Sequence, residues 1–362
     1  MSISEALLAL PTRRRASLEA LKTGLFGTPL NSALTLLTTA FLIWVVPPFL
    51  RWAIVDATWT GSAADCSSRS GACWAFVSAK FRFILFAFYP PELQWRPLLA
   101  MSLIVALLAA IALPRFWRRE LLVIWLLVIG TVWTLMSGTL LPPFVPSSQW
   151  GGLPITLLVW AVCFAGAAPL AILLALARQS KLGGLRTLAV IFIELMRGTP
   201  MVAILYVAML IIPMAVPGGQ LIDKTVRAIV MVTLFWSAYL AEVVRAGLQA
   251  IPPGQTEAAA SLGFGYWRTM QLVVLPQALR LVIPGMVNLA IGFLLATSLL
   301  AVIGIFDLLN AAKSSASDPQ WLGFYNEAYL LAAVIYFVLC FGGSRYSLWL
   351  ERYLRGAERH GI

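Results

Sequence analysis

Two pairs of oppositely charged residues lie within otherwise apolar stretches of this sequence. Glu194 and Arg197 are three positions apart, and so are Glu242 and Arg245, a spacing that places both side chains of a pair on one face of a helix. Ionisable groups in an apolar environment are costly and usually face the interior of a helix bundle. Each pair is therefore either an ion pair within one helix near a membrane surface or part of a path for a polar solute.

The first of these pairs is followed directly by a helix-breaking sequence, Gly198-Thr199-Pro200. Proline lacks an N–H donor, so the carbonyl groups of the preceding turn lose a partner. A broken helix that faces a cavity can offer such backbone groups to a zwitterionic substrate. We therefore expect this break to line a transport pathway.

Three further polar residues, Asn288, Thr297 and Ser298, interrupt another apolar stretch. Hydrogen bonding between helices and contact with a transported solute are equally good interpretations of them.

Residues suited to catalysis are missing from the apolar stretches. The single histidine, His360, is third from the C-terminus, and Cys163 and Cys340 are best interpreted as small packing residues. The sequence shows neither a cluster of metal ligands nor a glycine-rich phosphate loop that ends in Lys-Ser or Lys-Thr. We therefore predict no catalytic residue, no metal site and no cofactor in this chain.

The composition indicates which elements carry these residues. Of 362 residues, 60% are apolar and only 11% are charged, and the mean hydropathy is +0.88. This excludes a soluble enzyme, a disordered chain and a secreted disulfide scaffold, and continuous apolar runs exclude an outer-membrane barrel. About 20 apolar residues cross a bilayer core, so we predict an all-α, multi-pass membrane protein with about eight transmembrane helices. The apolar runs fall at about 31–50, 97–113, 120–141, 153–177, 188–213, 225–250, 278–304 and 326–349.

The positions of the basic residues predict the orientation. With Arg13, Arg14, Arg15 and Lys22 on the inside, 16 of the 26 basic residues fall in inner loops, including Arg115, Arg118 and Arg119, and eight fall outside. Both termini are therefore expected in the cytoplasm. The net charge of +11 reflects this topology and does not indicate binding to nucleic acid.

The outer loop over 51–96 contains Cys66 and Cys73, with six residues between them. In an oxidising compartment these cysteines either form a disulfide or remain free thiols, and their spacing alone does not decide between the two. Residues 74–89 are apolar but interrupted by Lys80 and Arg82. As a helix they are too short to cross the membrane, so we expect a helix that lies in the outer interface.

The segment over 251–280, on the predicted inner side, is too polar to span a membrane. Thr256 is expected to cap a short helix that begins at Glu257, Gly263 and Gly265 to allow a turn, and a second helix to run from Tyr266 to about residue 275. Pro276 is expected to begin the next element. We interpret the 251–280 segment as a compact pair of helices that contacts a soluble partner; the alternative is a solvated connecting loop.

The 251–280 segment resembles the EAA loop of importer-type ABC-transporter permeases. The resemblance rests on Glu257-Ala258-Ala259, then Gly263, then nine residues, then 273–276 (Val-Val-Leu-Pro), with valine at 273 where isoleucine is usual. It implies that the segment contacts a dimer of cytoplasmic ATP-binding subunits, which would bind ATP and Mg²⁺ and carry out the hydrolysis. The residues implied in this coupling are Glu257, Ala258, Ala259, Gly263, Phe264, Gly265, Tyr266 and Pro276.

The sequence around the charged pairs resembles the polar amino-acid uptake permeases. Glu194 before Arg197-Gly198-Thr199-Pro200, the run 239–242 (Tyr-Leu-Ala-Glu), 149–152 (Gln-Trp-Gly-Gly) and 305–309 (Ile-Phe-Asp-Leu-Leu) are most similar to the M-type permease of general L-amino acid importers. The resemblance implies a periplasmic amino-acid-binding protein and a second, homologous permease as partners in a heterodimer within the bacterial inner membrane. It also implies pathway roles for Glu194, Arg197, Gly198, Thr199, Pro200, Tyr239, Asn288, Thr297 and Ser298.

The predicted organisation has three parts: a three-span extension over 1–152, a five-helix permease core over 153–350 and a cytoplasmic tail over 351–362. One departure from the family lies at Leu295-Ala296, where the resemblance leads us to expect Lys-Asp. We therefore expect no charged substrate site there and expect the partner permease to carry it instead. The alternative function is a secondary, ion-coupled transporter, which should show inverted repeats and carboxylates near the membrane midplane.

Overall fold

The computed structural model describes residues 12–113, 120–215, 217–218 and 221–359. Arg115, Arg118 and Arg119, on which part of the topology prediction rests, and His360 lie outside the described residues. The described chain is helical apart from its loops and one two-residue strand, β1 (Phe306–Asp307). The predicted all-α fold class is confirmed.

The chain divides into two compact units, Met1–Ser78 and Ala79–Ile362. The first unit contains α2 (Thr12–Phe26), α3 (Pro29–Leu50) with a π-helical continuation over Arg51–Val55, and α4 (Ala63–Ser67). Helix α3 begins after Thr28, whose hydroxyl oxygen accepts the N–H of Asn31 at 3.1 Å. Helix α5 (Trp74–Phe86) begins in the first unit and ends in the second.

Among the described residues, six helices are long and apolar enough to cross a membrane: Pro29–Val55, Pro91–Ala112, Gly152–Arg178, Lys224–Ala250, Tyr266–Ile303 and Tyr325–Leu354. A bent pair, α9 (Gly183–Gly198) followed by Met201–Ala215, forms a seventh crossing if it is one span, with an angle of 104° between its halves. The remaining predicted run, 120–141, forms the shorter helix α7 (Glu120–Ser137). It ends four residues earlier than predicted because Gly138 takes a left-handed φ of 70° and two prolines, Pro142 and Pro143, follow.

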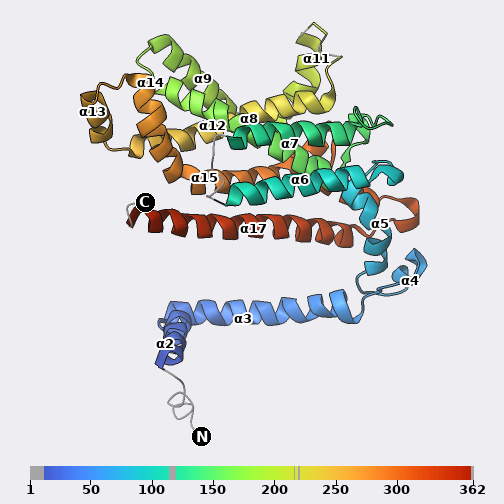
Figure 1. Ribbon diagram of the computed structural model, residues 1–362. Coiled ribbons are helices and arrows are strands. Elements are labelled where there is room, and N and C mark those ends of the chain that lie inside the picture. Colours follow the sequence, from blue (N-terminus) through green and yellow to red (C-terminus); the bar gives the residue numbers. More distant parts are fainter. Residues whose placement is uncertain (1–11, 114–119, 216, 219–220, 360–362) are drawn as a thin grey trace. The chain divides into compact units, whose positions relative to one another are not determined.

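The second unit is built around α8 (Gly152–Arg178) and α12 (Lys224–Ala250), which pack along much of their length. Small buried side chains on α8, including Cys163, Ala167, Ala171 and Ala175, allow this close approach. Helix α15 (Leu275–Ala296) packs against α12 and against α17 (Tyr325–Arg359), and α6 (Trp95–Ala112) packs against α7 and α8. In Figure 1 these helices run side by side as long rods.

Two short segments quoted above for the resemblance are paired in the structure. Gly151 and Gly152 form parallel bridges with Phe306 and Asp307. Gly152 has a φ of 68°, and a Cβ atom there would lie 2.0 Å from the carbonyl oxygen of Leu85. Glycine is therefore required at this position for both its conformation and its size. The pairing fixes the start of α8 against α16 (Leu308–Ser315), which follows β1 directly.

Candidate functional site

The 251–280 segment extends from one end of the helix bundle as two short helices, α13 (Pro253–Ser261) and α14 (Tyr266–Thr269) (Figure 1). The predicted cap at Thr256 is wrong. Helix α13 begins at Pro253, and the Thr256 hydroxyl instead donates to the Pro253 carbonyl at 2.7 Å. The φ of proline already suits a helix, and N–H groups in the first turn have no acceptor within the helix, so a proline there loses no hydrogen bond. The helix therefore starts about one turn earlier.

Helix α13 ends at a left-handed glycine. Gly263 has a φ of 76°, and the neighbouring Phe264 N–H donates to the carbonyl of Ala259 at 3.0 Å. A Cβ atom at Gly263 would meet nothing within 4 Å, so the position requires glycine for its backbone conformation and not for space. Gly265 has a φ of −74°, which any residue adopts.

The second helix does not stop near residue 275. A π-helical turn over Met270–Val274 leads without a break into α15, which begins at Leu275 and has Pro276 in its first turn, within one residue of the predicted boundary. Within the wide turn the Leu275 N–H bonds the Met270 carbonyl, and the side chain of Gln277 donates to the Val273 carbonyl at 2.9 Å. The turn thus accommodates a proline that would break a regular α-helix.

The outer surface of the 251–280 segment is apolar and aromatic. Leu262, Tyr266 and Trp267 have 75%, 54% and 64% of their surface exposed, and the rings of Tyr266 and Trp267 lie 5.3 Å apart. Glu257 and Ala258 are also exposed, whereas Ala259 is buried and Phe264 is half-buried. A cluster of exposed large apolar side chains on a polar segment is typical of a surface that another protein covers.

The base of the 251–280 segment is firmly packed. A buried apolar cluster joins α8, α12 and the start of α15, and contains Ala175, Leu176, Val244, Leu248, Val274 and Ala278. Gly247 on α12 allows a close approach, because a Cβ atom there would lie 2.6 Å from Val282 Cγ1 and 2.7 Å from the Ala278 carbonyl oxygen. The segment is therefore fixed to the two central helices of the bundle.

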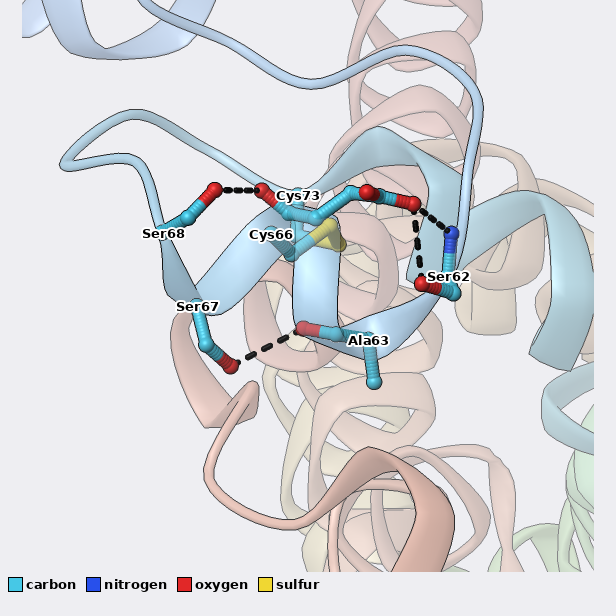
Figure 2. Close-up of a disulfide and its surroundings, with 7 residues drawn as sticks. Ser62, Ala63, Cys66, Ser67, Ser68 and Cys73 are labelled. Atoms are coloured by element: carbon cyan, nitrogen blue, oxygen red, sulfur yellow. Dashed lines mark hydrogen bonds between the residues drawn. A yellow bond between two sulfur atoms is a disulfide. The ribbon is translucent and has the colours of Figure 1, made fainter.

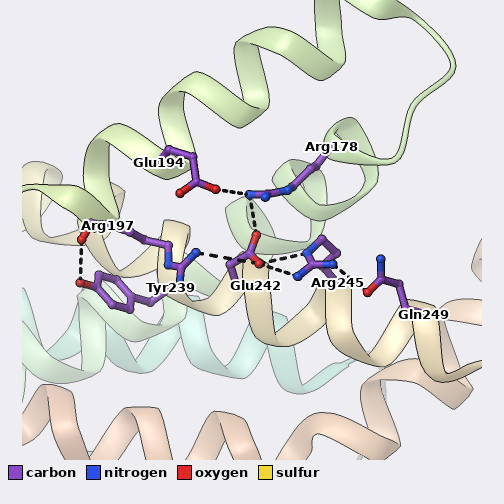
Figure 3. Close-up of polar contacts among 7 residues, drawn as sticks. All are labelled: Arg178, Glu194, Arg197, Tyr239, Glu242, Arg245 and Gln249. Atoms are coloured by element: carbon purple, nitrogen blue, oxygen red, sulfur yellow. Dashed lines mark hydrogen bonds and ion pairs between the residues drawn. The ribbon is translucent and has the colours of Figure 1, made fainter.

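A network of ion pairs lies at the same end of α8 and α12 (Figure 3). Arg178, at the end of α8, has its Nη1 atom 3.0 Å from Glu194 Oε1 and 2.7 Å from Glu242 Oε1. Arg245 donates to Glu242 Oε2 through Nε at 3.0 Å and Nη2 at 2.8 Å. The network thus links α8, α9 and α12.

The two charged pairs of the sequence behave differently in this network. Glu242 and Arg245 form the ion pair within one helix. Glu194 and Arg197 pair with other helices instead: Glu194 with Arg178, and Arg197 with Glu242, its Nη1 atom 3.9 Å from Glu242 Oε2. Sequence reasoning treated Arg178 only as an inner-loop charge. Its position at the end of a helix was the one available signal.

The break after α9 is held by side chains. The hydroxyl of Tyr239 donates to the Arg197 carbonyl at 3.3 Å, and the hydroxyl of Thr199 donates to the Leu195 carbonyl at 2.7 Å. The Arg197 guanidinium lies 5.8 Å from the centre of the Tyr239 ring, within range of a cation–π contact. Glu194, Arg197, Gly198, Thr199, Pro200 and Tyr239 are thus neighbours around one break.

Asn288, Thr297 and Ser298 belong to the later span Tyr266–Ile303, whose 3₁₀ segment Thr297–Ile303 contacts the helix Met201–Tyr206 that follows the break. Thr297 donates to the Leu294 carbonyl at 2.6 Å, and Ser298 donates to the Leu295 carbonyl at 2.8 Å, both within their own helix. Asn288 is exposed on α15. Among the described residues, none of the three is hydrogen-bonded to the residues around the break of α9. Leu295 has half of its surface exposed, so this position presents an uncovered apolar side chain.

Sequence reasoning also missed a buried carboxylate at the other end of the bundle. Asp307 is fully buried and caps α16, accepting the N–H groups of Leu309 at 3.0 Å and Asn310 at 3.2 Å. Burial raises the pKa of its carboxyl to about 6, although these hydrogen bonds act in the opposite direction. Next to it, the Leu308 N–H donates to the buried Thr156 hydroxyl at 3.0 Å.

In the first unit, Cys66 and Cys73 are joined by a disulfide, with their Cα atoms 5.5 Å apart (Figure 2). Ser62, before α4, donates to the Asp65 carboxylate from its N–H at 2.7 Å and from its hydroxyl at 2.8 Å. These hydrogen bonds hold the pKa of Asp65 below its ordinary value. A disulfide is expected on the oxidising side of a membrane.

Comparison with known proteins identifies the family. The family model described as binding-protein-dependent transport system inner membrane component matches residues 167–356, more than half of the chain. The inner membrane amino-acid ABC transporter permease protein YhdY of Escherichia coli (strain K12) is 44% identical over 337 residues, which are 91% of this chain and 90% of that protein. The glutamate/glutamine/aspartate/asparagine transport system permease protein BztC of Rhodobacter capsulatus is 32% identical over 417 residues and covers 96% of each chain.

Among solved structures, the crystal structure of an amino acid ABC transporter with histidines is 32% identical and covers 56% of this chain and 92% of its own, with a TM-score of 0.48. The family match agrees with the resemblance that the EAA-like sequence indicated. The chain belongs to the family of inner membrane components of binding-protein-dependent transport systems.

Proposed function

We propose that this chain is a permease subunit of an ATP-driven amino-acid importer in the bacterial inner membrane, where it forms half of the translocation pathway. The names of the relatives, amino-acid ABC transporter permeases, support the substrate class. The observation that carries the proposal is the 251–280 segment, whose outer surface is apolar and exposed and whose base is packed onto α8 and α12.

In this proposal the 251–280 segment binds a cytoplasmic ATP-binding subunit. Leu262, Tyr266 and Trp267 supply the apolar contact, and Gly263 sets the angle between α13 and α14. A dimer of the ATP-binding subunits binds ATP and Mg²⁺ and hydrolyses the nucleotide. Its closure would displace the segment, and the packed base would transmit that displacement to α8 and α12, since coupling between sites needs a physical connection.

The pathway itself is proposed to pass the break after α9. Arg197, Tyr239 and the backbone around Gly198-Thr199-Pro200 offer a cation, a hydroxyl and exposed peptide groups to the carboxylate and amine of an amino acid. Asn288, Thr297 and Ser298 are proposed to contribute from α15 and the turn that follows it. The ion pair between Arg178 and Glu242 holds α8 and α12 together beside this break.

The further partners follow from the same proposal. A second, homologous permease completes the pathway as a heterodimer, and a periplasmic binding protein delivers the amino acid to the outer face. Both termini lie in the cytoplasm, which agrees with a disulfide-bonded loop on the opposite, oxidising side.

The experiment is co-purification from membranes with mass identification of the partners, followed by uptake in proteoliposomes. We expect an ATP-binding subunit and a second permease in the sample and uptake that requires ATP. Leu262→Glu should release the ATP-binding subunit, whereas Leu322→Glu, on a comparably exposed leucine outside the 251–280 segment, should not. Uptake without any ATP-binding subunit would overturn the proposal and favour an ion-coupled transporter.

A further inference from the structure

The loop over 138–145 lies between α7 and the 3₁₀ turn Ser147–Gln149, and it continues a membrane crossing beyond the end of α7 at Ser137. In the sequence, Arg118, Arg119 and Glu120 precede the apolar part of α7, which therefore runs over 121–137 and at 1.5 Å per residue is about 26 Å long. The hydrocarbon core is about 30 Å thick. This apolar part alone does not carry the chain through the hydrocarbon, and the next few residues lie at or near its boundary.

The side chains of this loop are apolar and uncovered. Leu140, Leu141 and Phe144 have 75%, 45% and 65% of their surface exposed. They follow directly on α7, where Leu126 and Leu127 are also well exposed. Such a group would be unfavourable in water, but it continues the lipid-facing surface that a membrane helix presents.

The backbone of the loop is held by a buried arginine. Arg96, which is 2% exposed, donates from Nη2 to the Pro142 carbonyl and from Nη1 to the Pro143 carbonyl, both at 2.9 Å. The two prolines have no N–H groups that need partners. In addition, the Val145 N–H donates to the Ser137 carbonyl at 2.8 Å. Irregular backbone is tolerated close to hydrocarbon only where its polar groups are satisfied in this way.

The remaining polar groups set the depth of the loop. Within the described part of the chain, the N–H groups of Leu140, Leu141 and Phe144 have no hydrogen-bond acceptor. Such groups need the oxygen atoms of headgroups or water. This places the backbone of the loop at the headgroup boundary and its three large side chains below it.

We propose that the loop over 138–145 is a lipid anchor: Leu140, Leu141 and Phe144 insert among the acyl chains of the leaflet that is outer in the orientation proposed above. Arg96 is the positioning residue, because it fixes the backbone from which these side chains project. Acyl chains would cover the three apolar side chains. They would also surround the part of the crossing that lies beyond the end of α7. The proposal is independent of the substrate and of the ATP-binding subunit.

The test is the accessibility of a nitroxide spin label in the full-length protein in phospholipid bilayers. Cys163 and Cys340 are replaced by alanine, the Cys66–Cys73 disulfide is left intact, and the label is attached at Phe144→Cys or, as a control a few residues further on, at the exposed Ser148→Cys. We expect a several-fold higher ratio of oxygen to nickel-chelate accessibility at 144 than at 148. A label at 144 that favours the water-soluble nickel chelate would overturn the proposal, and low accessibility to both reagents would show that protein covers the loop.

A second variant tests Arg96. In the labelled protein, Arg96→Gln should shift the label at 144 toward the nickel chelate, whereas Arg82→Gln, which removes an exposed arginine near the same end of the bundle, should leave it unchanged. An unchanged label in Arg96→Gln would overturn the positioning role. The measurement at 144 in the protein with Arg96 intact tests the anchor even if Arg96→Gln does not fold.

Discussion

Arg178 and Glu242 form an ion pair between the ends of the two central helices, with Nη1 of the arginine 2.7 Å from Oε1 of the glutamate. Both side chains are largely buried, 22% and 16% exposed. Arg178 also forms an ion pair with Glu194 on α9, so it helps to position α9, which ends at the break.

We therefore expect Arg178→Gln to destabilise the protein by about 1–3 kcal/mol, because Glu194 loses its ion pair and Oε1 of the largely buried Glu242 loses its cation, while Arg245 still holds Oε2. Thermal unfolding of the purified protein measures this. Arg186→Gln is the matched control, since Arg186 is exposed on α9 and has no ion-pair partner among the described residues. In a double-mutant cycle, Arg178→Gln and Glu242→Gln should be non-additive by about 1–2 kcal/mol; strict additivity would contradict a direct interaction.

Substitution of Gly263 should impair coupling in the proposed importer. Gly263→Ala forces alanine into a φ of 76°, which costs about 1 kcal/mol and changes the angle between α13 and α14. We expect ATP hydrolysis in the assembled complex to continue with reduced uptake.

The control for this experiment is Gly265→Ala. Its φ of −74° suits alanine, and a Cβ atom there would meet nothing within 4 Å, so hydrolysis and uptake should remain coupled. Equal uptake by the two variants would show that the conformation of Gly263 has no part in coupling.

The outline of the fold was predictable because crossing hydrocarbon demands long apolar runs. Each predicted run contains helix in the described residues, although the run over 188–213 is bent after Gly198 and that over 120–141 is helical only to Ser137. The local errors come from prolines. Pro253 starts α13 earlier than the Thr256 pattern indicated, and the chain enters α15, with Pro276 in its first turn, through a π-helical turn instead of a break. A sequence pattern shows where a proline is, but whether a neighbouring turn widens to accommodate it depends on tertiary packing.

Removal of Arg197 should reduce amino-acid uptake without loss of stability. Its side chain is 37% exposed and its nearest carboxylate oxygen is 3.9 Å away, so it contributes little to folding. We expect Arg197→Gln to lower the initial rate of ATP-dependent uptake at least tenfold with an unchanged melting temperature. Arg186→Gln again serves as the control, and normal uptake by Arg197→Gln would exclude Arg197 from the pathway.

Asp307 should give the protein a pH-dependent stability that Asp307→Asn removes. Burial raises the pKa of Asp307 from 3.8 in the unfolded chain to about 6, so the folded state retains a proton that the unfolded state has lost. The contribution of the Asp307 carboxyl group to the free energy of unfolding therefore falls as the pH rises from about 4 to about 6, by about 3 kcal/mol in total. Above that pH the contribution is constant. Asparagine still accepts the N–H groups that begin α16.

The measurement is the melting temperature of both proteins between pH 4.5 and pH 7.5. Other carboxylates contribute equally to both proteins, so the difference between the two is the quantity of interest. We expect the advantage of Asp307→Asn to grow as the pH rises toward 6; a difference that is constant across the range would show that Asp307 titrates normally.

The candidate site was only partly predictable. The residues around the break after α9 are adjacent in sequence, apart from Tyr239, and could be found together. The partners of Glu194 and Arg197 could not be found, because Arg178 and Glu242 approach them only when α8, α9 and α12 have packed. Helical spacing left an intrahelical ion pair open for both pairs; the structure has it for Glu242 and Arg245, whereas Glu194 pairs with Arg178.

The uninterrupted helix over Tyr266–Ile303 has 38 residues and is therefore about 57 Å long. Its part over 266–280 belongs to the 251–280 segment, and its last turns contain Thr297 and Ser298. The tight contact between Gly247 and Ala278 lies about a third of the way along it and is suited to act as a fulcrum. A tilt of about 5° around that point would move the far end of the helix by roughly 3 Å, about the radius of a small amino-acid side chain. In the proposed importer, a small movement of the 251–280 segment on one side of the membrane would therefore become a larger displacement on the other side. That displacement would be large enough to open or close a passage.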